Sequence, residues 1–202
     1  MHIWRMAERL AVRNFILLLM LFFTTAAFAV VLPSHCERAM RRAFNAKASW
    51  VMSRTVPGAV RPLVSTGVVS FAVKKGIRWE VRHPFVESVT MTTNEMIFAD
   101  EDSRRVKPLS QLPHYTELQN ACDSFFSGDS KAFDGIFDSS VSITSNGAWT
   151  VTMVPSVSAM RRLMTKVEVS GCDTLDHAVI YTGDGGKSSI RFKELPGVVP
   201  TF

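Results

Sequence analysis

Cysteine is scarce in this sequence, and none of it is arranged for metal or redox chemistry. The 202 residues include three cysteines, Cys36, Cys122 and Cys172. None belongs to a Cys-x-x-Cys pair or to a Cys/His spacing that indicates a metal site. In an oxidising compartment we expect one disulfide and one free thiol, and all three pairings remain open.

The sequence also lacks the motifs of known catalytic sites. It contains no Gly-x-Ser-x-Gly elbow, no His-Glu-x-x-His pair, no phosphate-binding loop and no carboxylate pair at a suggestive spacing. Residues 183–186 are rich in glycine but lie between two predicted strands, so we expect a hairpin turn there. The histidines after the first 29 residues are scattered singly, as structural or surface histidines are: His35, His83, His114 and His177. We therefore predict no catalytic residue, no metal site and no cofactor.

Clusters of basic residues are missing as well. The formal net charge is +5, from 23 Lys and Arg against 18 Asp and Glu that are interspersed along the chain. A nucleic-acid-binding surface needs clustered Lys and Arg, so we exclude nucleic acid as a partner. The densest group is Arg38, Arg41 and Arg42, which matches the solvated face of a helix. A contact with lipid headgroups or a partner is the alternative for this group.

The first 29 residues have the pattern of a secretory signal peptide. Arg5, Arg9 and Arg13 precede an apolar run over residues 15–23, and Ala27-Phe28-Ala29 forms an Ala-x-Ala cleavage site. An uncleaved membrane anchor is the alternative, although two threonines interrupt the apolar stretch. Cleavage after Ala29 removes three arginines and one glutamate, which lowers the net charge from +5 to +3. We expect residues 30–202 to form a single exported domain, and we expect the protein to be a monomer.

Residues 67–85 predict two antiparallel strands and a turn. Apolar residues recur at every second position on both sides of Lys74-Lys75-Gly76, and after the turn they alternate with charged ones. This period of two indicates a sheet with one covered face and one wet face. Gly76 tolerates the positive φ of a tight turn, and Pro84 ends the pairing because it has no backbone donor.

Similar patterns predict about eleven strands in all. Besides the hairpin they cover residues 50–54, 86–92, 96–100, 104–107, 141–144, 148–154, 163–169, 175–181 and 188–193. A capping box at Ser34-x-x-Glu37 predicts an N-terminal helix over residues 37–47. Apolar residues at helical spacing predict two more helices in the middle of the chain, with Tyr115, Leu118, Cys122, Phe125 and Phe126 in the first, and Ala132, Phe133, Ile136 and Phe137 in the second.

The predicted fold is mainly β, in the α+β class. An antiparallel sheet of this size must curl to bury its apolar face, which gives an open or closed barrel. The two middle helices are expected across its mouth. Aromatic residues and methionines are the candidates for the interior, and such residues line sites for flexible apolar ligands but also fill ordinary cores. The candidates are Phe71, Trp79, Phe85, Met91, Phe98, Phe125, Phe126, Phe133, Phe137, Trp149 and Met153.

Several short stretches occur in a distinctive order. They are RPLVSTG at residues 61–67, IRWE at 77–80, HPF at 83–85, FSGD at 126–129, WTVTMVP at 149–155 and IRF at 190–192. Their order and spacing resemble the LolA family of periplasmic carriers of outer-membrane lipoproteins, especially its divergent LolA-like branch. The resemblance covers roughly residues 37–193.

The resemblance implies an unclosed antiparallel β-barrel with two lid helices over an apolar cavity. The cavity would hold the acyl chains of a lipoprotein or related lipid on their way from the inner to the outer membrane. Transient partners would be an inner-membrane exporter and an outer-membrane acceptor. In the best-known members an arginine near the position of Val73 holds the lid shut, and here Lys74 and Lys75 follow as candidates for that latch.

Two other functions remain open. A non-transporting module that binds or senses lipids in an envelope or glycolipid-export system would use the same cavity without handing its ligand on. A periplasmic hydrolase of lipids or thioesters would need a nucleophile–base pair, which the sequence does not display.

Overall fold

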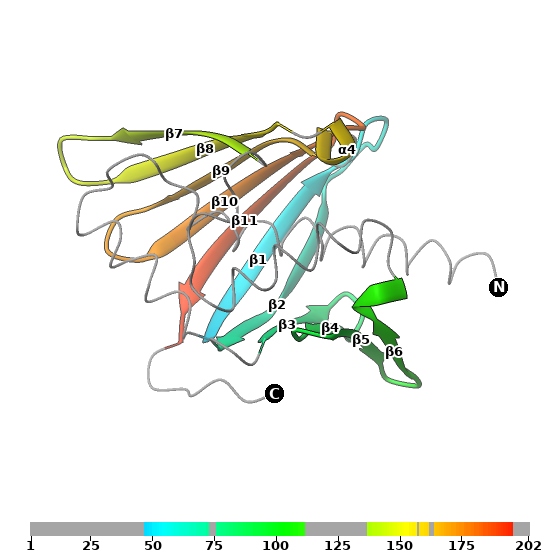
Figure 1. Cartoon of the computed structure of the whole chain (residues 1–202). Coiled ribbons are helices and arrows are strands. Elements are labelled where there is room, and N and C mark those ends of the chain that lie inside the picture. Colours follow the sequence, from blue (N-terminus) through cyan, green and yellow to red (C-terminus); the bar gives the residue numbers. More distant parts are fainter. Residues whose placement is uncertain (1–46, 73–75, 112–136, 157, 162–163, 196–202) are drawn as a thin grey trace.

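The described part of the chain is one antiparallel sheet of eleven strands (Figure 1). The computed structural model describes residues 47–72, 76–111, 137–156, 158–161 and 164–195. A short 3-10 helix, η1 (Leu109–Gln111), and a four-residue helix, α4 (Ser158–Arg161), accompany the sheet. The strands are β1 (Lys47–Thr55), β2 (Leu63–Ala72), β3 (Gly76–His83), β4 (Glu87–Met91), β5 (Glu95–Asp100), β6 (Arg104–Pro108), β7 (Phe137–Ile143), β8 (Trp149–Pro155), β9 (Met164–Gly171), β10 (Leu175–Thr182) and β11 (Lys187–Glu194).

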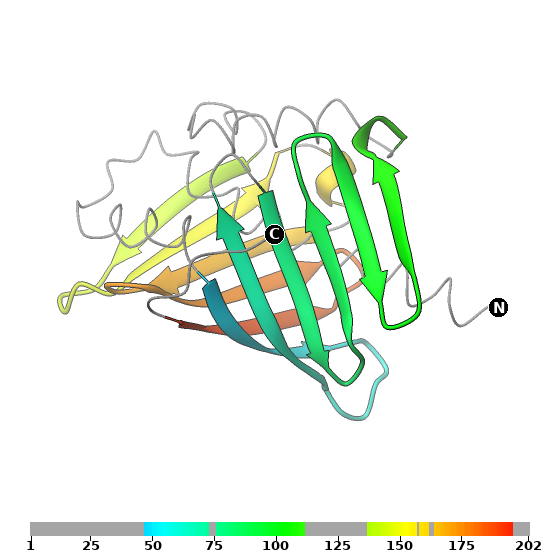
Figure 2. The ribbon, with the colours of Figure 1, turned by 90° about the horizontal axis from the view of Figure 1, so that it is seen from below.

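The strand order shows that the sheet is not closed. Neighbours in space are neighbours in sequence, except that β1 pairs with β11, and the order runs β6-β5-β4-β3-β2-β1-β11-β10-β9-β8-β7. β6 and β7 are therefore the two free edges. Seen from below, strands β3–β6 cross β8–β11 at a steep angle (Figure 2). This is the geometry of a strongly twisted sheet that curls around its apolar face.

The predicted strands are confirmed, with differences at their ends. Each of the eleven has a counterpart, and β2 begins four residues before the predicted hairpin. The glycine-rich turn after β10 is also confirmed, because Gly185 adopts a φ of 81° and donates to the Thr182 carbonyl oxygen over 3.0 Å. Only glycine takes up this conformation without a steric penalty.

Two helix predictions are wrong at their ends. Phe137 was expected in the second middle helix but begins strand β7, where it pairs with Pro155 of β8 and is buried. Lys47, expected to end the N-terminal helix, begins β1 instead. The remainder of that helix and of the two middle helices lies outside the described residues.

Alternate residues of the strands point to one buried face, which we call the core face. On β8, for example, Trp149, Val151 and Met153 are buried while Thr150 and Thr152 between them are partly exposed. One hydrophobic cluster joins core-face residues from β1 through β5 and from β7 through β11. Burial of this cluster is what makes the sheet curl.

The expectation of one wet face fails in the middle of β2. Val68 and Ser70 point away from the core face, yet both are buried. They stand directly opposite Glu80 and Arg78 of β3, whose long side chains can cover small neighbours with their aliphatic stems. β2 is thus covered on both faces at its centre.

Gly67 of β2 occupies a position where no side chain fits. A Cβ atom there would lie 1.9 Å from the Glu80 carbonyl oxygen and 2.5 Å from Cζ2 of Trp50. We expect Gly67→Ala to lower the free energy of unfolding by about 3 kcal/mol, because backbone and ring must both move.

Gly58→Ala is the control for this substitution. A Cβ at Gly58 meets no atom within 4 Å, and only its φ of 81° is unfavourable. We expect a cost of about 1 kcal/mol there, measured for both variants by urea denaturation. Equal costs at the two positions would contradict the packing described for Gly67.

Candidate functional site

The core face is rich in aromatic side chains and methionines. Its methionines come from five strands, β1, β4, β5, β8 and β9, and all are buried. Flexible thioether side chains repack around objects of different shape, unlike branched aliphatic ones. The buried aromatic residues and methionines of this face are Trp50, Met52, Phe71, Trp79, Met91, Met96, Phe98, Phe137, Trp149, Met153 and Met164.

Two tryptophans stack across the centre of the sheet. Trp50 of β1 and Trp79 of β3 have ring centroids 4.0 Å apart and planes inclined by 13°. β2 runs between their strands, and the residue of β2 opposite Trp50 is Gly67. Because glycine has no side chain, the two rings can meet above it. The stack ties three strands together on the core face.

A second tryptophan–glycine contact lies toward the other edge of the sheet. Trp149 of β8 stands opposite Gly171 of β9, where a Cβ atom would come within 3.0 Å of Cζ2 of the ring. The indole Nε1 of Trp149 donates a hydrogen bond to the Cys172 carbonyl oxygen over 2.8 Å. Trp50 differs, because its buried Nε1 has no hydrogen-bond partner among the described residues.

The core face becomes polar toward the end where β1, β3 and β5 finish. Arg54 is only 3% exposed and stands opposite the buried Ser188. On the other wall Glu87 of β4 pairs with Asp100 of β5. The opposite end of the face carries the apolar residues Phe71, Ile77 and Met91. On β1–β5 the face therefore changes from apolar at one end to charged at the other. On β7 and β9 the end that corresponds to Arg54 carries the buried residues Phe137 and Met164.

The two carboxylates at this polar end have opposite pKa shifts. Burial raises the pKa of Glu87 above its ordinary value, and the neighbouring charge of Asp100 raises it further. The pKa of Asp100 is lowered by hydrogen bonds, first from the Ser103 hydroxyl and then from the backbone N–H groups of Asp102 and Ser103. Glu87 is therefore the carboxylate that takes up a proton first as the pH falls.

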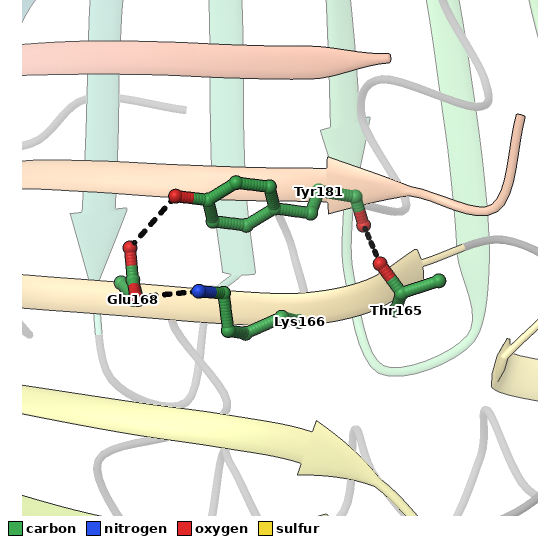
Figure 3. Close-up of polar contacts among 4 residues, drawn as sticks. All are labelled: Thr165, Lys166, Glu168 and Tyr181. Atoms are coloured by element: carbon green, nitrogen blue, oxygen red, sulfur yellow. Dashed lines mark hydrogen bonds and ion pairs between the residues drawn. The ribbon is translucent and has the colours of Figure 1, made fainter. Parts of the chain in front are cut away.

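The outer face of β9 and β10 carries a polar network instead (Figure 3). Glu168 accepts hydrogen bonds from Lys166 Nζ at 2.8 Å and from the Tyr181 hydroxyl at 3.1 Å, and Lys166 Nζ lies 4.2 Å from the centre of the Tyr181 ring. The bond from Lys166 is the main cause that lowers the pKa of Glu168. This network is solvated and links two neighbouring strands.

One serine–histidine contact lies on the same outer face. His177 Nε2 and Ser189 Oγ are 2.8 Å apart. Burial, followed by the charge of Arg191, lowers the pKa of His177. In the part of the chain that the structure describes, no carboxylate hydrogen-bonds to this histidine, so the orienting acid of a catalytic triad is not supplied there. The described residues also contain no group of three or more potential metal ligands.

The structure brings most of the predicted site residues together. Phe71, Trp79, Met91, Phe98, Phe137, Trp149 and Met153 all belong to the one buried cluster. Phe85 does not, because it lies in the turn between β3 and β4 and is 78% exposed. Phe125, Phe126 and Phe133, together with Lys74 and Lys75, lie outside the described residues.

Other residues of the core face were not among the predicted site residues. Met52 and Arg54 follow Trp50 at intervals of two on β1, so the alternation of that strand already placed them on the same face. Glu87 precedes Val89 by two residues on β4 and follows the same rule. Met164 stands at the start of β9. Cys172, the one cysteine that is described, is a free thiol and partly buried.

A family model for outer membrane lipoprotein carrier protein LolA-like sequences matches residues 30–180. The chain belongs to the LolA-like family. This confirms the resemblance found in the sequence. The family takes its description from outer membrane lipoprotein carrier proteins. No curated protein matches the sequence.

Three solved structures show some similarity to this chain. One is a LolA superfamily protein from Nitrosomonas europaea, which is 8% identical with a TM-score of 0.38; the match covers 89% of this chain and 93% of that one. The MucA/MucB complex of Pseudomonas aeruginosa is 12% identical with a TM-score of 0.45, covering 83% and 57%. A putative outer membrane lipoprotein-sorting protein domain from Vibrio parahaemolyticus is 8% identical with a TM-score of 0.37, covering 78% and 90%. Among the described residues of the LolA-like chain, no helix is long and apolar enough to cross a membrane.

The raised pKa of Glu87 makes stability depend on pH in a defined direction. The Glu87 carboxyl group holds its proton more tightly in the folded protein than in the unfolded chain. Its contribution to the free energy of unfolding is therefore present at low pH and is lost as the pH rises through the pKa of the folded state. We expect Glu87→Gln to raise the free energy of unfolding at pH 7, by less than about 1 kcal/mol for a partly solvated group, and to leave it nearly unchanged at pH 3.5.

Urea denaturation of the wild type and Glu87→Gln across this pH range measures the difference. Glu101→Gln, in the exposed turn after β5, is the matched control and should show no such trend. A Glu87→Gln effect of the same size at both pH values would contradict the assignment.

Proposed function

We propose that this LolA-like protein is a periplasmic carrier that holds acyl chains of lipoproteins or related lipids against its core face. It moves them from the inner to the outer membrane, between an exporter and an acceptor that it contacts transiently. The protein reaches the periplasm through a signal peptide cleaved after Ala29 and acts as a monomer without catalysis. The observation that carries this proposal is the continuous core face of buried aromatic residues and methionines, in a chain of this family.

The energetics of acyl chains explain why such a face is needed. Burial of each methylene stabilises an acyl chain by about 0.8 kcal/mol. Transfer of a chain of about 16 carbons from the membrane into water therefore costs roughly 12 kcal/mol of free energy. A carrier must replace most of that burial and still release its cargo. Contacts spread over methionines and aromatic rings suit this requirement because each is weak and easily rearranged.

The change from apolar to charged along β1–β5 of the core face fits an amphiphile. The apolar end, with Phe71, Ile77 and Met91, accommodates the chains, and the end with Arg54 and Glu87 lies toward the polar group that bears them. Trp50 adds a buried indole N–H that has no partner among the described residues. A buried donor without a partner costs about 1–3 kcal/mol, and the carbonyl oxygen of an acyl ester or amide would satisfy it.

Native mass spectrometry of the protein recovered from the periplasm, followed by lipid extraction, is the direct test. We expect co-purified acyl lipid or lipoprotein at about one molecule per chain, at the mass of the mature protein that begins after Ala29. A protein without lipid that also fails to bind a fluorescent acyl probe would overturn the proposal. Transfer of bound cargo between inner- and outer-membrane vesicles separates a carrier from a module that only binds.

Met153→Lys should abolish binding of the acyl probe, because it places a charge in the middle of the core face. Thr152→Lys is the matched control on the same strand, with its side chain on the outer face opposite Glu168. It should bind as the wild type does. Circular dichroism checks that both variants fold, and Met153→Leu tests the site with little change in volume. Retained binding in a folded Met153→Lys variant would remove this residue from the site.

Trp50→Phe removes the indole N–H and keeps most of the ring. We expect affinity for an ester-linked acyl probe to fall by about fivefold, the equivalent of one hydrogen bond, while affinity for a hydrocarbon probe of equal length is unchanged. An equal loss for both probes would show that packing, and not the hydrogen bond, is responsible.

A further inference from the structure

Five large apolar side chains are exposed where strands β1 and β3 end. Val60, in the loop between β1 and β2, is 98% exposed, and Phe85, in the turn between β3 and β4, is 78% exposed. The other three are Leu63 and Val64 at the start of β2 and Val86 beside Phe85. We call these five residues the apolar rim. Isolated exposed apolar residues are ordinary, but a group of this size at one end of a molecule marks an interaction surface.

The strand register explains why the rim is exposed. Thr66 of β2 pairs with His83 of β3, and the residues of β2 before Thr66 pair only with β1. Leu63 and Val64 thus lie beyond the part of β2 that β3 covers. The loop before β2 and the turn after β3 leave the same end of these paired strands, and both lie at the lower edge of the molecule in Figure 2.

The rim segments themselves carry mainly positive charge. The rim segments, residues 56–66 and 82–87, contain Arg61, Arg82 and His83, and Glu87 is their one acidic residue. Arg61 is exposed, and Arg82 forms an ion pair of 2.7 Å with Glu80 while its side chain stays 57% exposed. Glu87 belongs to the core face. Within the rim segments, Arg61 and the exposed side of Arg82 are therefore the groups that can contact an anion.

We propose that the apolar rim inserts into the interfacial region of an anionic lipid membrane, with Arg61 and Arg82 against the lipid phosphates. Apolar side chains on projecting loops, backed by cations, match the acyl boundary and the negative surface of such a membrane. The loop and the turn lie on different parts of the edge, and a lipid surface can contact both without a groove to receive either. The polar end of the core face, with Arg54 and Glu87, then faces the headgroups.

This proposal does not depend on the carrier function, since docking to a membrane needs only the rim. Its test is flotation of the native protein with vesicles of phosphatidylethanolamine and phosphatidylglycerol, compared with phosphatidylcholine vesicles. The double variant Val60→Ser/Phe85→Ser should partition onto the anionic vesicles about tenfold less than the wild type. Arg61→Gln should lose about fivefold on anionic vesicles and little on phosphatidylcholine.

The matched control is Val106→Ser/Ile143→Ser. Both residues are exposed apolar side chains of the free edge strands, β6 and β7, outside the rim. This control should float as the wild type does, and circular dichroism confirms the fold of every variant. A wild type that binds neither kind of vesicle would overturn the proposal. Rim variants that bind as well as the wild type would also overturn it, because another segment would then be responsible.

Discussion

The packing of tryptophan rings over glycines is the constraint on which the interior of the sheet depends. Trp50 can stack on Trp79 only because Gly67 between them has no side chain. In the same way, the ring of Trp149 packs over Gly171. A sheet that curls brings its core-face side chains closer together, so the bulkiest ones need neighbours of minimal size. Glycine at these two positions lets the face be both aromatic and strongly curved.

Polar and apolar side chains are separated in two ways, between the two faces of the sheet and along the length of its strands. Across each strand, alternation separates the buried face from an outer face that holds solvated pairs such as Lys166 and Glu168. Along β1–β5, the buried face changes from Phe71 and Met91 at one end to Arg54 and Glu87 at the other. The first separation is what any half-buried sheet requires. The second goes beyond that requirement, because a covered face needs only apolar side chains to be buried.

The strands and most residues of the core face could be predicted from the sequence, because apolar residues recur at every second position along an uninterrupted strand. This alternation placed Phe71 and Trp79 on one face and located all eleven strands, although β2 and β7 begin four residues before their predicted starts. Phe85 was misjudged because Pro84 breaks the strand, and the alternation that precedes it no longer fixes where the next side chain points. Phe137 was misjudged because its spacing from Phe133 suits a helix, whereas pairing with β8 places it in a strand. Such long-range pairing is invisible to a local pattern.

The unpaired edges of the sheet have a mechanical consequence. In a closed barrel the number and stagger of the strands fix the diameter, and widening it requires hydrogen bonds to break. Among the described residues, β6 and β7 pair with the sheet on one side only, so twisting and bending of the sheet can change the distance between them. An open sheet of this kind therefore permits a change in the width of its interior without the loss of a hydrogen bond between strands.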